Sequence, residues 1–201
     1  MHLLLSLYFV LRLIAGPPID VLVDSTHTLP YWYAPGENTA ARQALEDMIG
    51  AAEDQGLRAA VFSGYRSYEY QAQVYKREAR AWPQRVDDFI AEPGHSEHQL
   101  GTAFDIAWPG LPVESLDERN LRVFKWVQAN AHEFGFVLSY PLKYTREWPY
   151  NNRWKPHQGD FIYEPWHIRY VGVDLALEMD AAGYLDPESD VYPSDFYLAW
   201  P

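Results

Sequence analysis

The chain has 201 residues, of which 48% are apolar and 16% aromatic, so it is too hydrophobic for a disordered protein and long enough for one domain with its own core. Its net charge of −12 would repel nucleic acid, which we do not expect as a partner, and gives no electrostatic attraction toward anionic lipid. Cysteine is absent, which excludes disulfides and thiolate-bound zinc. Any metal must therefore be held by His, Asp or Glu.

Residues 1–16 form an apolar segment that allows two interpretations. The stretch LLLSLYFVLRLIAG is similar to the core of a secretory signal peptide, but no basic residue precedes it and Arg12 interrupts it. It is also shorter than the ~20 residues that span a bilayer. An N-terminal arm packed on the domain and a degenerate export signal or anchor both stay open. We expect no transmembrane segment, and we take residues 17–201 as one domain.

The first two predicted helices follow an extended, proline-rich lead-in over residues 17–37. A helix is expected from Asn38 or Thr39, with Gly56 just beyond its end. The second should begin after Ser67, which is a good N-cap residue, and should run toward Trp82 before Pro83 stops it. The stretch LRAAVF between the two helices predicts a strand.

The second half of the chain continues to mix helices with strands. Ser115 and Glu118 have the spacing of a capping box, which predicts a third helix that Gly135 closes. Further strands are predicted at GTAFDIAW and FGFVLSY and in DFIYEPWHIRYVG, where Pro165 interrupts the strand before a last helix. Strict βαβ alternation is missing and several connections are short. The predicted fold class is therefore α+β, with a mainly antiparallel sheet flanked by helices.

The stretch EPGHSEHQLGTAFDI, residues 92–106, contains the first candidate metal ligands. Gly101 favours a turn after His98 that leads into a strand, so His98 and Asp105 can converge. Asp105 would share its strand face with alanines, where an unpaired carboxylate is costly and a metal would compensate its charge. His95 lies close enough in sequence to replace His98, and from the residues alone either could be the ligand.

The second candidate stretch is YEPWHIRYVG, which contains Glu164 and His167. The helical HExxH zinc motif is excluded, since the spacing and the order differ, and Pro165 must bend the chain if both residues serve one site. His98, Asp105 and His167 would leave one position of a tetrahedral zinc site open in a cleft, as in catalytic sites. Zinc lowers the pKa of its bound water to about 7, and Glu164 could take up the released proton.

Three motifs occur in the order SGYRSYEYQAQVY, PGHSEHQLGTAFDI and YEPWHIRYVG. Over about residues 20–185 the chain resembles the VanY-type D-alanyl-D-alanine carboxypeptidases, which belong to a group of zinc peptidases with phage endolysin peptidases and the hedgehog domain. The resemblance implies one zinc ion bound by His98, Asp105 and His167, and it thereby favours His98 over His95. It further implies the remaining roles: Glu164 as general base, Arg66 as the cation that stabilises the oxyanion, and Ser96 and Gln71 near the substrate.

The activity that the resemblance implies is hydrolysis of the terminal D-Ala-D-Ala bond of peptidoglycan stem peptides, in an extracytoplasmic location. A related D,D-dipeptidase and an L-Ala-D-Glu endopeptidase share these motifs and stay open as alternatives. A non-catalytic zinc-binding module is a more distant one, and the presence of both Glu164 and Arg66 argues against it. Residues 141–159, which are aromatic and basic, are expected either to form part of a cleft wall or to fold as a surface loop.

Overall fold

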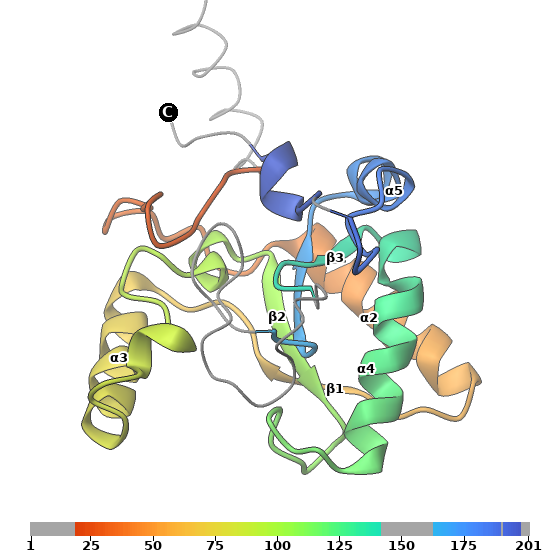
Figure 1. Cartoon of the computed structure of the whole chain (residues 1–201), viewed down its shortest axis with the longest axis horizontal. Helices are drawn as coiled ribbons and strands as arrows, with labels where there is room; N and C mark the ends of the chain where they lie inside the picture. The colour runs from red at the N-terminus through yellow and green to blue at the C-terminus, as the bar shows by residue number, and fades with distance from the viewer. Residues whose placement is uncertain (1–18, 142–162, 190, 198–201) are drawn as a thin grey trace, which may run out of the picture.

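The computed structural model describes residues 19–141, 163–189 and 191–197 (Figure 1). The apolar segment 1–16 lies outside these residues, and so does the segment 141–159 beyond Pro141. No helix within the described ranges is long and apolar enough to cross a membrane.

A four-stranded antiparallel sheet forms the centre of the molecule (Figure 1). In spatial order the strands are β1 (Ala60–Ser63), β2 (Ala103–Ala107), β4 (His167–Tyr170) and β3 (Phe136–Leu138). All three strand pairs are antiparallel, so the strands β2 and β4, which are far apart in sequence, lie side by side in the middle. The predicted α+β fold of one domain with an antiparallel sheet is confirmed.

Helices flank the sheet on both sides. Figure 1 shows α2 (Thr39–Asp54) and α4 (Glu118–Asn130) together on one side, whereas α3 (Tyr68–Ala81) stands apart on the other. Helix α5 (Val173–Ala181) follows β4 near the chain end. Short 3-10 helices connect these elements: η1 (Val86–Asp88), η2 (Glu97–Leu100), η3 (Ala131–Phe134) and η4 (Pro193–Phe196).

The two faces of the sheet have different chemistry because side chains alternate along each strand. Phe104 and Ile106 of β2 point into the main hydrophobic core, where they pack with residues of α2 and α4. Burial of one such side chain contributes about 1.5–3 kcal/mol. On the opposite face β2 and β4 place three buried ionisable residues, Asp105, His167 and Arg169. One face of the sheet therefore stabilises the fold while the other carries the candidate site.

Most helix boundaries agree with the sequence predictions. The side chain of Ser67 caps α3, as predicted, and the side chain of Asn38 caps α2, which was expected to begin at Asn38 or Thr39. The predicted capping box at Ser115 is wrong, because the N-cap of α4 is Asp117, whose carboxylate accepts a hydrogen bond from the backbone N–H of Arg119. The Ser115 hydroxyl instead accepts the N–H of Asp117 in the preceding turn.

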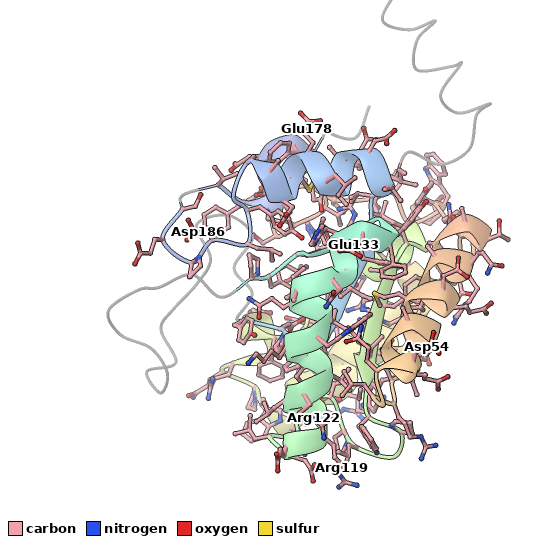
Figure 2. All side chains as sticks on the ribbon, turned by 90° about the vertical axis from the view of Figure 1, so that its right-hand side faces the viewer. Asp54, Arg119, Arg122, Glu133, Glu178 and Asp186 are labelled. Carbon is pink, nitrogen blue, oxygen red and sulfur yellow. The ribbon has the colours of Figure 1, made fainter. Side chains whose placement is uncertain are left out.

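Charged side chains cover the outer surfaces of the helices, away from the sheet. Figure 2 shows Asp54 at the end of α2, Arg119 and Arg122 on α4, and Glu178 on α5, and all four are exposed. Charged side chains on the outer face are expected for helices that bury only one side, although Leu121 of α4 and Leu177 of α5 are also exposed.

Candidate metal centre

The register between β2 and β4 brings two of the predicted ligands together. Asp105 is paired directly with His167 across the two strands. Side chains of directly paired residues point to the same face of a sheet and lie close together. The third ligand, His98, belongs to η2, and the turn at Gly101 leads from η2 into β2.

Glycine is required at that turn. Gly101 has a φ of 79°, and a Cβ atom at this position would lie 2.0 Å from the backbone oxygen of Gly36. The backbone can therefore adopt this path past residue 36 only without a side chain. The turn positions His98 beside the strand that carries Asp105.

His98, Asp105 and His167 form a buried cluster whose possible ligand atoms all lie within 4.8 Å of one another. Nε2 of His98 lies 3.2 Å from Oδ2 of Asp105, and Nδ1 of His167 lies 3.1 Å from Oδ1 of the same carboxylate. This set of two imidazoles and one carboxylate is one that zinc accepts.

The second ring nitrogen of each histidine is held by an acceptor. Nδ1 of His98 donates a hydrogen bond to the backbone oxygen of Gly64 at 2.7 Å, and Nε2 of His167 donates to Oε2 of Glu97 at 3.0 Å. Outer-shell acceptors of this kind fix the orientation and tautomer of metal-binding histidines. Nε2 of His98 is buried and makes no hydrogen bond within the described residues, as expected of an atom placed to bind a metal. The cluster therefore has the donor set and geometry that could hold a metal ion such as Zn²⁺.

Glu97 is a residue of this centre to which the sequence analysis gave no role. It is 3% exposed and accepts hydrogen bonds from Nη1 of Arg169 at 2.7 Å and from Oγ of Ser139 at 2.5 Å, in addition to that from His167. Arg169 also donates to the backbone oxygens of Ile19 and Val21. The sequence contained one indication of such a residue. Arg169 follows His167 by two positions and so shares its strand face. A cation buried on that face needs a carboxylate partner, which the structure shows to be Glu97.

The ionisation of the cluster follows from burial and from its charged neighbours. Burial and the guanidinium of Arg66 lower the pKa of His98 to about 4, which keeps this imidazole in the neutral form that binds metals. Burial acts to lower the pKa of His167, but hydrogen bonds to Asp105 and Glu97 outweigh it and raise the pKa to about 10. Without a metal, His167 thus carries the positive charge that its two carboxylate neighbours favour, and a metal ion would replace that proton.

Arg66 and Glu164 lie beside the cluster. Nη2 of Arg66 is 3.7 Å from Oδ2 of Asp105. Glu164 is buried, and its burial raises the pKa of its carboxyl group to about 8. A carboxyl group with a pKa near neutrality is suited to accept and return a proton.

One cavity of about 740 Å³ connects all of the predicted site residues. Its lining includes the three cluster residues and also Arg66, Glu164, Ser96 and Gln71. Nε2 of Gln71 donates to the backbone oxygen of Ala91 at 2.7 Å, while Oε1 of Gln71 has no partner within the described part of the chain. The structure thus places Ser96 and Gln71 at the cavity, and their contact with a substrate stays a prediction.

His95 lies apart from this cluster. Its Nδ1 donates to the backbone oxygen of Asp24 at 2.7 Å. Of the two histidine candidates, His98 is therefore the one that lies in the cluster, and its role as a metal ligand stays a prediction.

Comparison with known proteins identifies the family. The family model "VanY: D-alanyl-D-alanine carboxypeptidase" matches residues 36–173. The Bacillus subtilis (strain 168) protein YodJ is 38% identical over 139 residues, which cover 68% of this chain and 46% of YodJ. The chain spans about half the length of the curated relatives it matches.

Two solved structures are similar over most of the chain. The LdcB LD-carboxypeptidase has 28% sequence identity and a TM-score of 0.65, with 85% of this chain and 88% of that chain covered. VanYB in complex with D-alanine-D-alanine has 26% identity and a TM-score of 0.66, with 85% and 99% covered. With the family model matching well over half of its length, the chain belongs to the VanY family of D-alanyl-D-alanine carboxypeptidases.

Proposed function

We propose that the protein is a zinc-dependent D,D-carboxypeptidase that removes the terminal D-alanine from peptidoglycan stem peptides. One observation carries the proposal: the buried cluster of His98, Asp105 and His167 shares a single cavity with Glu164 and Arg66. This combination supplies a metal site, a proton acceptor and a fixed cation around one substrate position. Membership of the VanY family supports the same activity, and with such a substrate we expect the protein to act in the cell envelope.

His98, Asp105 and His167 would hold one Zn²⁺ ion. A bound zinc ion supplies Lewis acidity, which polarises a carbonyl group and makes water acidic enough to lose a proton near pH 7.

The roles of the remaining residues follow from charge and position. Glu164, with its raised pKa, accepts a proton from the attacking water. The same carboxyl group then donates this proton to the departing nitrogen of D-alanine, so that the peptide bond is replaced by a carboxylate and an amine. Arg66 stabilises the negative charge that develops on the carbonyl oxygen, and its burial strengthens that interaction. Ser96 and Gln71 would contact the substrate from the cavity wall.

A second candidate activity is the removal of a D-residue that follows an L-residue. It is favoured by the similarity to LdcB, which is named as an LD-carboxypeptidase. VanYB, which has a similar TM-score, is described in complex with D-alanine-D-alanine. The two activities therefore have to be separated by substrate. Release of D-Ala-D-Ala as a dipeptide would instead identify a D,D-dipeptidase, and an internal cut in the stem would identify an endopeptidase.

The test is an end-point assay on muramyl pentapeptide and muramyl tetrapeptide, with products separated by mass spectrometry. Protein loaded with zinc, protein treated with a chelator and Glu164→Ala are compared side by side. We expect one D-alanine from the pentapeptide with the loaded protein only, and Glu164→Ala should still bind zinc. Cleavage of the tetrapeptide alone would establish the LD activity instead. Zinc binding with neither substrate cleaved would reject both activities and favour a binding module.

A further inference from the structure

We propose that the cavity extends along helix α3 as a binding groove for the upstream part of the stem peptide, and that Arg77 binds the free carboxylate of its γ-linked D-glutamate. This inference rests on the proposed function and names a substrate feature that the enzyme selects. It starts from residues of the cavity that take no part in the chemistry proposed above.

The groove follows one face of α3. Residues on successive turns of the helix line the same cavity as the metal cluster, beginning with Tyr70 and Val74 and continuing through Arg77 to Trp82. Arg66, which borders the cluster, comes directly before Ser67, the N-cap of this helix. The helix therefore begins at the catalytic end of the cavity and leads away from it, on the side of the sheet opposite α2 and α4 (Figure 1).

The spacing of residues along α3 is comparable with that of residues along a stem peptide. Arg77 lies two helical turns beyond Tyr70, which is roughly 10 Å along the axis. The γ-linked glutamate lies two residues before the residue whose carbonyl is attacked. At ~3.5 Å per extended residue, plus the γ-linkage, its α-carboxylate lies roughly 10 Å from the scissile bond. The terminal carboxylate of the substrate lies on the other side of that bond, one residue downstream.

The chemistry at the far end suits an anionic, partly apolar ligand. The side chain of Arg77 is 67% exposed, and its ion pair with Glu78 uses Nε at 2.8 Å. The two terminal amino groups of the guanidinium can still donate to a carboxylate, and exposed ion pairs of this kind contribute little and exchange readily. Arg85 also lines this cavity.

Aromatic side chains form the apolar part of the groove. Phe62 and Trp82 are both more than half exposed, although large aromatic side chains are usually buried, and both line the cavity. Exposed apolar surface that lines a cavity next to a catalytic centre is typical of a ligand-binding groove. These walls would pack against the aliphatic parts of the stem on either side of its glutamate.

The experiment compares two pentapeptides that differ by one charge: one with γ-linked D-glutamate and one with D-isoglutamine in its place. For each zinc-loaded variant, the ratio of kcat/KM for the acidic to the amidated peptide is measured. We expect Arg77→Gln to reduce this ratio about tenfold, which corresponds to loss of one charge-assisted hydrogen bond. Arg80→Gln is the matched control, because Arg80 belongs to the same helix but does not line the cavity.

The outcomes separate this inference from the proposed function. An unchanged ratio in Arg77→Gln, with the wild-type protein cleaving both peptides, would overturn the α3 groove as the glutamate site and leave the carboxypeptidase intact. An equal change in Arg80→Gln would also overturn it, since the effect would then be one of general charge. Failure of the wild-type protein to cleave either peptide would reject the proposed function, and this inference with it.

Discussion

Replacing Glu97 by glutamine should weaken zinc binding without removing any of the proposed ligands. Glu97 accepts the Nε2–H of His167 and thereby fixes the ring so that Nδ1 faces Asp105. The amide of Glu97→Gln keeps the shape but loses the charge that strengthens this hydrogen bond. Loss of an outer-shell partner typically costs 10–100-fold in metal affinity, which is about 1.4–2.7 kcal/mol.

The same substitution also has a predictable effect on stability. Arg169 is fully buried, and Glu97 is the carboxylate with which it forms an ion pair. Removal of one partner of a buried ion pair costs about 3–5 kcal/mol, because the other charge stays in the interior. The double variant Glu97→Met with Arg169→Met removes both charges and should recover much of that stability. It should not recover the zinc affinity, since His167 still lacks its acceptor.

The assay is a competition titration of zinc against a chelator, on protein shown to be folded by circular dichroism. Cobalt-substituted protein provides a second readout, because the visible spectrum of Co²⁺ reports on ligand geometry. Glu133→Gln serves as the control, since Glu133 is exposed and does not line the cavity that contains the cluster. A folded Glu97→Gln protein whose zinc Kd stays within about threefold of wild type would refute the reasoning.

Substitutions at Arg66, Phe104 and Gly101 test the oxyanion cation, the core and the turn before β2. Arg66→Lys should reduce kcat by roughly 10²–10³ while zinc binding persists, since a lysine cannot present the planar guanidinium to the oxyanion; equal losses in kcat and zinc content would contradict this role. Phe104→Ala should lower the free energy of unfolding by about 3–5 kcal/mol in urea titrations, because Phe104 is fully buried beneath α2 and α4, and a loss below about 1 kcal/mol would show that the core collapses around it. Gly101→Ala should abolish zinc binding or folding, since the new Cβ would overlap the backbone of Gly36; a stable variant with normal zinc content would show that the turn can move.

Much of the local structure could be predicted from the sequence. Asn38 and Ser67 mark the beginnings of α2 and α3 because a cap depends on one side chain and the next few amides. The alternation around Asp105 predicted a strand. On that strand Asp105 shares one face with Ala103 and Ala107, while the other face carries Phe104 and Ile106. The wrong cap at Ser115 shows the limit of such rules, since Asp117 two positions later competes for the same amides.

The assembly of the centre depends on tertiary structure. The amino-acid sequence limited the possible metal ligands to His, Asp and Glu and left His95 and His98 as alternatives, between which the resemblance to the VanY family favoured His98. It could not show that Glu97 orients His167 and is paired with Arg169, because those contacts join residues about 70 positions apart in the chain. Strand register decides which side chains share a sheet face, and that register is set by the packing of the whole core rather than by neighbouring residues. For the same reason, only the folded chain revealed that one face of α3 continues the cavity away from the metal cluster.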